Sequence, residues 1–337
     1  MATINLAVEI GTSYTSIFVS GEGVVLREST TIAYNGEGEK KKPIAYGNEA
    51  YKLIGKAPDK TVVVNPVRDG YIVEVEAMTD LMTEFIKRIL PTSYVFYPKI
   101  KVLLAVPTGL EVEERKIYEE IMLKSGVAEV TLVDNVITTA HGLELPIDAP
   151  ESALVVNMGS GVTEIALISL CGTITGCSIS VAGAMLDRAL MDFVTGKYGI
   201  KIGIATARRV REEIASLYVN DTSSMEVSGI SINTLTPKTV RIYAIDTYEA
   251  LMPYFARIAE AIKGNTNLCP PELAESLHEN GVFIAGGLSK TPGLKEFFAD
   301  IIELPVTVAP DGELTAIYGA GKLLEDKPLL NKIIAQQ

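Results

Sequence analysis

The sequence predicts a mixed α/β protein built from two similar halves. At about 150 residues per domain, a chain of 337 residues has room for two domains that each bury a core. Residues 8–17 near the N-terminus have a counterpart far along the chain at residues 156–165, and such a repeat indicates duplicated units. Between the two copies strand-like and helix-like segments alternate, which is typical of a largely parallel sheet.

The first half begins with a predicted hairpin. Ile4, Leu6, Val8 and Ile10 alternate with small or polar residues, which is the period of a strand, and residues 16–19 resume the pattern after a turn of glycine, serine and threonine. Downstream, apolar spacing predicts helices over residues 78–89 and 112–125, a buried strand over 100–106 that Pro107 ends, and another strand over 129–133.

The second half repeats the hairpin and adds helices. Periodicity predicts helices over residues 184–198, 206–217, 246–264 and 291–298, and an apolar strand over 282–285. Two segments lack the character of core strands: residues 33–65, with a charged turn at 36–42, and residues 186–247. We expect these segments to form smaller subdomains, one inserted in each half.

Composition excludes several classes of protein. Forty-two acidic against 30 basic residues give a net charge of -12, which argues against nucleic-acid binding because that affinity depends on clustered Lys and Arg. The N-terminus enters a strand directly and no window reaches about 18 uninterrupted apolar residues, so we expect neither export nor a membrane span. Cys171, Cys177 and Cys269 fit no metal-binding spacing and are expected to be reduced thiols, the first two in paired strands. His141 and His278 are isolated and expected to be structural.

The paired glycine turns are the main candidate for chemistry. A tight turn of Gly, Ser and Thr directs several backbone N–H groups at one point, and such nests bind phosphate oxygens. Gly11, Gly159 and Gly161 would let a ligand approach the main chain closely, the alternative being ordinary hairpin turns. Because the turn occurs twice, and a further Gly-Gly turn follows the strand at residues 282–285, we predict two facing turns that grip one polyphosphate.

These residues carry a resemblance that extends over nearly the whole chain. The sequence is similar to bacterial actins of the MreB and MamK type, which share a fold with actin, the heat-shock chaperone ATPases and sugar kinases. The matching motifs, in family order, are the first phosphate loop at residues 8–12, residues 65–70 and 105–109, the second phosphate loop at 157–164, residues 181–187 and 269–274, the adenosine-type turn at 285–287, and residues 318–322.

The resemblance implies a two-lobed actin-like fold, a duplicated ribonuclease-H-like α/β architecture in which each lobe carries a smaller inserted subdomain. The implied divisions are residues 1–32, 66–145 and 313–337 for the first core (IA), 33–65 for its insertion (IB), 146–185 and 248–312 for the second core (IIA), and 186–247 for its insertion (IIB).

The resemblance also implies ATP or ADP, with Mg²⁺, in the cleft between the lobes. By correspondence with the family motifs, the phosphates would be held from one side by Gly11, Thr12, Ser13 and Tyr14 and from the other by Gly159, Ser160, Gly161 and Val162. Gly286, Gly287 and Leu288 would lie against the adenosine. Arg211 and Glu213 would contact base and ribose, the alternative being a solvated helix face.

The chain departs from the family at three acidic positions. Glu9 and Asn157 stand where the family has an Asp in each phosphate loop, and Asn135 stands where it has a Glu before a proline. Mg²⁺ prefers charged oxygens in octahedral geometry, which Glu9 and Asn157 would reach through water. The attacking water needs an acceptor, for which Asn135 and its neighbour Asp134 are the catalytic candidates. We therefore predict that nucleotide binding through backbone N–H groups persists while any ATPase activity is weak.

The function that the resemblance implies is a cytoskeletal one, with subunits that add head to tail into a cytoplasmic filament used as a scaffold. Its expected partners are further copies of itself, with cytoplasmic cargo or a membrane-associated adaptor as additional candidates, and no nucleic acid. Two alternatives stay open. One is a non-polymerising actin-fold adaptor or pseudo-ATPase, and the other is a small-molecule kinase, which the three replaced acids disfavour.

Direct contact with a membrane is not expected. Residues 327–334 are mildly amphipathic, and we predict a helix docked on the core rather than an anchor. Tyr94, Phe96 and Tyr97 cluster where the family's apolar loop would lie, and we expect them to pack within the protein.

Overall fold

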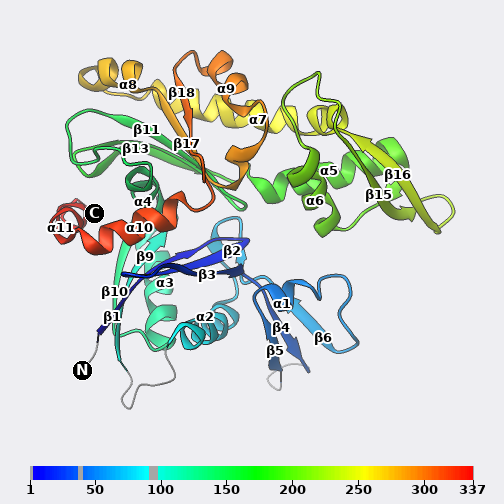
Figure 1. Cartoon of the computed structure of the whole chain (residues 1–337), viewed down its shortest axis with the longest axis horizontal. Coiled ribbons are helices and arrows are strands. Elements are labelled where there is room, and N and C mark those ends of the chain that lie inside the picture. Colours follow the sequence, from blue (N-terminus) through cyan, green and yellow to red (C-terminus); the bar gives the residue numbers. More distant parts are fainter. Residues whose placement is uncertain (1–2, 37–40, 91–97, 337) are drawn as a thin grey trace.

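Two five-stranded sheets, one in each lobe, organise the chain (Figure 1). The structure is a computed structural model that describes residues 3–36, 41–90 and 98–336. In Figure 1 the blue and cyan lobe lies below the green and orange lobe, and the red helices α10 (Thr315–Glu325) and α11 (Lys327–Ile334) lie at the level between them. The predicted two-lobed α/β fold is confirmed.

The sheet of the first lobe combines an antiparallel meander with two parallel strands. Its strands, in spatial order, are β10 (Glu129–Asp134), β9 (Lys99–Val106), β1 (Thr3–Ile10), β2 (Tyr14–Val19) and β3 (Gly23–Ser29). Along β1, Leu6 and Val8 enter one apolar core and Ala7 enters another, because successive side chains point to opposite faces. The strand is therefore apolar on both faces, as expected of a sheet covered on both sides.

The sheet of the second lobe repeats this topology. Its strands, in spatial order, are β13 (Gly172–Ile179), β12 (Thr163–Ser169), β11 (Ala153–Met158), β17 (Val282–Ala285) and β18 (Val306–Val308). Like β1, β11 pairs antiparallel with the strand that follows it and parallel with a strand from much later in the chain. The repeated sequence is therefore a repeated fold.

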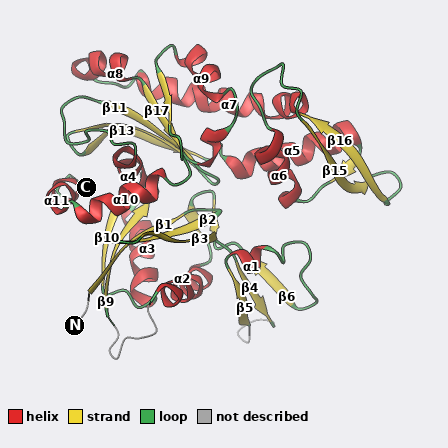
Figure 2. Ribbon diagram, in the orientation of Figure 1, coloured by secondary structure: helices red, strands yellow, loops and turns green. Residues whose placement is uncertain are grey.

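Helices cover the outer faces of the sheets (Figure 2). In the first lobe α2 (Val75–Ile89) and α3 (Val112–Lys124) share a core with Leu6 and Val8. In the second lobe α7 (Ala244–Thr266), α8 (Ala274–Asn280) and α9 (Leu294–Ile302) share a core with Leu154 and Val156. The amphipathic spacing that predicted these helices is therefore the pattern of their packing on the sheets.

Between the two sheets, α10 packs against α4 (Asn135–Gly142). One apolar cluster joins both helices to the facing sides of both sheets. We call it the interlobe cluster, and its buried members are Ala7, Leu103, Val133, Val136, Ile137, Ala140, Ile147, Val155, Ala166, Ile168, Cys171, Ile317, Ala320, Leu323 and Ile333. The lobes therefore share a core in addition to having their own.

Two smaller sheets extend from the same side of the lobes, at the right in Figure 2. The smaller sheet of the first lobe consists of β5 (Lys42–Tyr46), β4 (Ile32–Asn35) and β6 (Thr61–Val64), beside α1 (Asn48–Tyr51). The smaller sheet of the second lobe consists of β14 (Ile200–Lys201), β15 (Ser224–Ser231) and β16 (Pro237–Tyr243), beside α5 (Gly183–Tyr198) and α6 (Ile204–Ile214). The remaining short elements are β7 (Val67–Arg68), β8 (Tyr71–Ile72) and the 3₁₀ helices η2 (Pro271–Leu273) and η3 (Gly287–Lys290). The residue boundaries of IA, IB, IIA and IIB stay predictions.

Three local predictions need correction. The helix predicted over residues 291–298 begins at Leu294, because Gly293 has φ +80° and η3 precedes it. The helix predicted over 206–217 ends at Ile214, where the chain turns to an extended conformation at Ala215. Cys171 lies in the turn before β13, with φ 66°, while Cys177 lies in the strand as predicted.

The segments considered for membrane contact have different outcomes. α11 docks on the core as predicted, because Ile333 is fully buried in the interlobe cluster. Tyr94, Phe96 and Tyr97 lie outside the described residues. Within the described ranges, no helix combines the length and the apolar character that crossing a bilayer requires.

The contact between α4 and α10 should be sensitive to a single methyl group. A Cβ at Gly319 would lie 1.8 Å from the carbonyl oxygen of Thr138 and 2.6 Å from the backbone nitrogen of Gly142. Since both neighbours are backbone atoms, the helices must separate, and we expect Gly319→Ala to lower the free energy of unfolding by roughly 2–4 kcal/mol in urea titrations.

The matched control is Gly264→Ala, an exposed helical position on α7 where an added Cβ meets open space. The same substitution there should raise stability by about 0.5–1 kcal/mol, because alanine loses less backbone entropy on folding. Equal effects at the two positions would contradict the close packing of α4 on α10.

Candidate functional site

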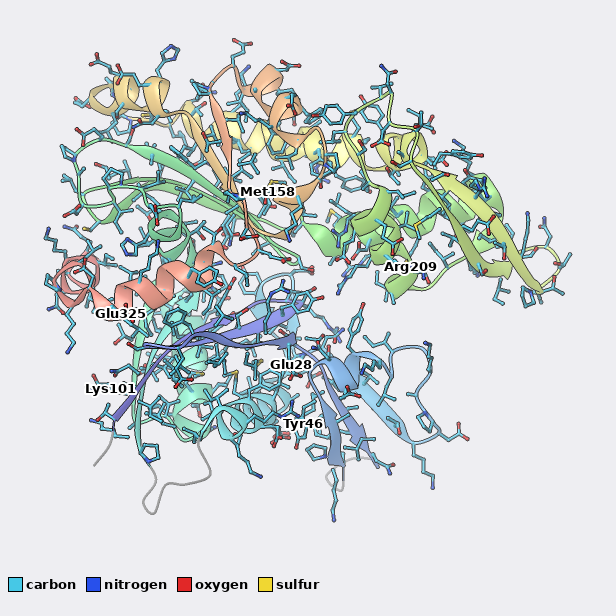
Figure 3. The ribbon with its side chains drawn as sticks, in the orientation of Figure 1. Glu28, Tyr46, Lys101, Met158, Arg209 and Glu325 are labelled. Carbon is cyan, nitrogen blue, oxygen red and sulfur yellow. The ribbon has the colours of Figure 1, made fainter. Side chains whose placement is uncertain are left out.

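One cavity of about 410 Å³ lies between the lobes and is bounded by both glycine turns. A cavity of this size suits a small ligand. Its walls come from the turn after β1, the turn after β11, the beginning of η3 and one face of α6. In Figure 3, Met158 marks the end of β11, where the second glycine turn begins, and Arg209 marks α6.

The structure brings together most of the residues selected from the sequence. Those that line the cavity are Glu9, Gly11, Thr12, Ser13, Tyr14, Asn135, Asn157, Gly159, Ser160, Gly161, Val162, Arg211, Gly286, Gly287 and Leu288. A group of charged residues that were not predicted from the sequence also lines it, namely Arg27, Glu164, Arg208, Glu212, Lys290 and Glu313.

Two selected residues do not line the cavity. Asp134 ends β10 and forms an ion pair of 2.7 Å with Arg115. Glu213 is more than half exposed on α6, 4.0 Å from Arg209, and Glu212 lines the cavity instead. One residue along a helix turns the side chain by about 100°, so a register error of one position selects the wrong carboxylate.

The two glycine turns have matching geometry and meet each other. Gly11 donates its backbone N–H to the carbonyl of Tyr14 at 3.0 Å, and Gly159 donates to the carbonyl of Val162 at 3.0 Å. The Ser13 hydroxyl donates to the Ser160 hydroxyl at 2.6 Å, which joins the lobes across the cavity. A Cβ at Gly161 would lie 2.0 Å from Thr12 Oγ1, so only glycine permits this approach.

A buried carboxylate behind the turns organises the polar groups of the cavity. Glu164 is 2% exposed and accepts hydrogen bonds from the backbone N–H of Thr108 at 2.8 Å, from Asn135 Nδ2 at 2.7 Å and from Asn157 Nδ2 at 3.1 Å. Both amides that replace the family's acids therefore direct their NH₂ groups at Glu164. This arrangement satisfies a charge that would otherwise be costly to bury.

The repeat itself contains the signal for Glu164. Asn157 stands opposite Glu164 in the pairing of β11 with β12, as Glu9 stands opposite Ser16 in the pairing of β1 with β2. The two copies thus carry their carboxylates on different strands, the first strand in one lobe and the second in the other. In the aligned repeat, Glu164 corresponds to Ser16, and a charged residue at that position of a buried strand is the signal that marks Glu164.

The surroundings of Glu9 in the cavity raise the pKa of its carboxyl group. Burial, with the nearby Glu164 as a smaller contribution, raises the pKa of Glu9 to about 7 against the opposing effect of Arg27. Burial also raises the pKa of Glu164, while its hydrogen bonds from Thr108, Asn135 and Asn157 act in the opposite direction. Two carboxylates in one poorly solvated site disfavour simultaneous ionisation.

The wall on the α6 side is held by a buried ion network. Asp187 on α5 is fully buried and accepts from Arg211 Nε at 2.6 Å and Arg208 Nε at 3.3 Å. The guanidinium of Arg208 also lies 5.7 Å from the ring centroid of Tyr51, the last residue of α1 beside the smaller sheet of the first lobe. This network fixes Arg211 where it lines the cavity, and Arg208 joins α6 of the second lobe to α1 of the first.

The residues present do not form a resident metal centre. Within the described part of the chain, no group of three or more His, Cys, Asp or Glu side chains is placed to hold a metal ion. Glu9 is partly exposed, whereas Glu164 is buried and already accepts hydrogen bonds from two amides and a backbone N–H. Mg²⁺ needs several oxygen ligands in near-octahedral geometry, and these side chains alone do not supply them, so water and the oxygens of a bound ligand would have to complete the set.

Comparison with known proteins gives consistent matches over the whole chain. The family model described as "MreB/Mbl protein" matches residues 3–332. The cell shape-determining protein MreB of Escherichia coli (strain K12) is 32% identical over 328 residues, which cover 96% of this chain and 94% of that protein. The cell shape-determining protein Mbl of Bacillus subtilis (strain 168) is 29% identical, covering 97% of this chain and 98% of that protein.

Solved structures match the same fold. MreB5 of Spiroplasma citri, crystallised with ADP and with AMPPNP, superposes with a TM-score of 0.90 at 29% identity and covers 98% of both chains. A MamK double helical filament matches with a TM-score of 0.80 at 20% identity, over 96% of this chain and 99% of that one. At 20% identity the MamK match bears on the fold alone.

The raised pKa of Glu9 should be visible in stability measurements. The folded state holds a proton that the unfolded chain releases near pH 4.5, so wild-type stability should fall as pH rises from about 5 through about 7. Glu9→Gln removes this effect. The stability of the variant relative to wild type should therefore increase by roughly 2 kcal/mol between pH 5 and pH 8, in urea titrations with EDTA and no nucleotide.

The control is Glu144→Gln, an exposed carboxyl whose pKa is lowered by a hydrogen bond from Lys322. Its contribution to stability is present above pH 4.5 and lost at lower pH, so this variant should show no gain between pH 5 and pH 8. A constant difference between wild type and Glu9→Gln over that range would contradict the assignment.

Proposed function

Because the chain belongs to the MreB/Mbl family of bacterial actin-like proteins, we propose that it binds an adenine nucleotide between its lobes and assembles into cytoplasmic scaffold filaments. The single observation that carries the proposal is the meeting of two matching glycine turns over one interlobe cavity. The structures of MreB5 of Spiroplasma citri with ADP and with AMPPNP support a nucleotide as the ligand, since that chain matches this one over nearly its full length.

The nucleotide would lie across the cavity with its phosphates between the glycine turns. Backbone N–H groups of residues 11–14 and 159–162 are the donors for the phosphate oxygens, an interaction that side-chain replacements leave in place. Gly286, Gly287 and Leu288 would face the adenosine, and Arg211, oriented by Asp187, would face the base or ribose. Glu212, which lines the cavity, would take the role that the sequence predicted for Glu213.

Mg²⁺ would enter with the nucleotide, as the counter-ion of its phosphates, because residues 3–36, 41–90 and 98–336 hold no cluster of side chains that could bind a metal by itself. Glu9 and Asn157 are the residues that would reach it, through water. Asn135 would contact an attacking water through its amide, and it carries no charge with which to activate that water. Hydrolysis would therefore be slow, and nucleotide binding rather than turnover would govern assembly.

Self-association would use a head-to-tail contact that does not close, which generates a filament. The MreB and Mbl relatives are cell shape-determining proteins, and the MamK match is a filament, so this fold is compatible with polymers. A cargo or a membrane-associated adaptor would attach to the filament. The replaced acids favour one alternative, an actin-fold adaptor that binds nucleotide without polymerising.

Assembly should depend on the integrity of the glycine turns. Wild-type protein should sediment with ATP or AMPPNP and stay in the supernatant without nucleotide. In Gly161→Val the new side chain would collide with Thr12 and with the backbone of Gly70, whose nitrogen lies 2.6 Å from the added Cβ. Since the turns must separate, we expect nucleotide affinity to fall about tenfold or more and sedimentation to be lost.

Gly196→Val provides a control on α5, because an added Cβ there meets open space. It should sediment like wild type. Wild-type protein that binds nucleotide yet stays monomeric at high concentration would favour the non-polymerising adaptor. Failure to bind any nucleotide would overturn the proposal itself.

Restoring the family's acids should restore hydrolysis. We expect phosphate release from Mg²⁺-ATP by Asn157→Asp, Asn135→Glu protein to exceed that of wild type by about tenfold or more, because the variant regains charged oxygens for the metal and an acceptor for the water. Both new carboxylates face Glu164, so folding is checked by circular dichroism and rates are compared at saturating nucleotide. Wild-type turnover equal to that of the variant would refute the view that hydrolysis has been relaxed.

A further inference from the structure

One guanidinium points into the cavity from the first lobe. Arg27 on β3 stands opposite Ser16 on β2, and Ser16 stands opposite Glu9 on β1. Residues directly opposite each other in antiparallel strands present their side chains on the same face of the sheet. Glu9, Ser16 and Arg27 therefore form one row across three strands, and all three line the cavity.

Arg27 is positioned by contacts that leave part of its guanidinium unused. Its guanidinium carbon lies 4.2 Å from the ring centroid of Tyr14, in the first glycine turn. Its Nη2 donates to Glu313 Oε2 at 3.1 Å. Its Nε is buried and, among the described residues, is the one buried side-chain nitrogen with no hydrogen-bond partner. A buried donor without an acceptor is unfavourable, so a turn of the guanidinium that brings Nε to an incoming oxygen would be favourable.

Like Arg27, the other cations that line the cavity are paired with carboxylates. Arg208 and Arg211 are both held by the buried Asp187. Lys290 is half exposed and forms an ion pair of 2.8 Å with Glu313. Glu313 therefore has a second cationic partner and would keep it if Arg27 turned to a ligand. The planar guanidinium of an arginine can donate two parallel hydrogen bonds to a phosphate, and the guanidinium stays charged over the physiological pH range.

We propose that Arg27 is a phosphate-binding residue of this cavity, and that its fixed charge makes binding of a nucleoside di- or triphosphate largely independent of divalent metal. The inference rests on the proposed nucleotide function. Its physical basis is charge balance: the described residues at the site form no resident metal centre, yet a polyphosphate enclosed between two lobes needs positive charge close to it. Arg27 supplies that charge from the strand beside the first glycine turn, with Tyr14 fixing its orientation.

A purely structural Arg27 would behave differently from a phosphate-binding one. If Arg27 only joins β3 to the loop before α10, then Arg27→Gln and Glu313→Gln remove the same ion pair and should affect nucleotide binding alike. If Arg27 binds phosphate, Glu313→Gln frees it and should maintain or increase affinity, whereas Arg27→Gln should decrease it. Arg88→Gln is the matched control, since Arg88 has similar exposure and pairs with Glu28 and Glu84 outside the cavity lining.

The experiment measures binding of the N-methylanthraniloyl derivative of ATP by fluorescence, at constant ionic strength, in EDTA and in Mg²⁺. Wild-type affinity should differ by less than about threefold between the two conditions. In EDTA, Arg27→Gln should bind about tenfold or more weakly, a loss typical of one charge-assisted hydrogen bond, with a smaller loss in Mg²⁺. Arg88→Gln should match wild type in both, and thermal unfolding verifies that each variant is folded.

Two results would overturn the inference while leaving the proposed function intact. One is wild-type binding that requires Mg²⁺, and the other is Arg27→Gln that binds in EDTA as tightly as wild type. Equal losses in Arg27→Gln and Glu313→Gln would assign Arg27 to structure and also overturn it. Absence of nucleotide binding in wild type under both conditions would overturn the proposed function, and this inference with it.

Discussion

The packing of α4 against α10 between the two sheets is the constraint on which the cavity depends. Gly319 lies against the backbone of Thr138 and Gly142, so closely that no side chain fits. Small residues such as Ala7, Ala140 and Ala166 fill the surrounding interlobe cluster. Because protein interiors are close-packed, this contact sets the separation of the sheets and therefore of the turns at their ends. The hydrogen bond between Ser13 and Ser160 is its consequence at the cavity.

The replaced acids form a consistent set rather than a series of independent losses. Two carboxylates remain at the turns, and the amides of Asn135 and Asn157 both donate to Glu164. Acids at positions 135 and 157 would instead repel Glu164 in a poorly solvated site unless a metal ion lay between them. The amides thus stabilise the buried charge without a metal. Arg27 adds a cation in the same strand row as Glu9, so acidic and basic side chains both line the cavity.

Fold and site chemistry are separable in this molecule. The fold depends on three apolar clusters, and it superposes on MreB5 of Spiroplasma citri with a TM-score of 0.90 at 29% identity. The chemistry depends on a few side chains at the ends of β1, β2, β3 and β11. A cluster tolerates substitution that conserves volume, whereas a change of one carboxylate to an amide alters charge and hydrogen bonding directly. The family fold can therefore persist while the side chains of the cavity change.

The sequence by itself determined the duplicated α/β architecture, most of its elements and the two glycine turns, because strand alternation, helical spacing and turn glycines are local patterns that survive packing. It did not determine where α9 begins, because that depends on the left-handed conformation of Gly293. Nor did it determine that Glu212 rather than Glu213 faces the cavity, because that depends on the rotation of α6. Only the tertiary structure decided the roles of Glu164, Arg27 and Glu313. These residues come from strands and loops far apart in the chain, and their charges acquire meaning only from the groups that folding places within hydrogen-bond distance.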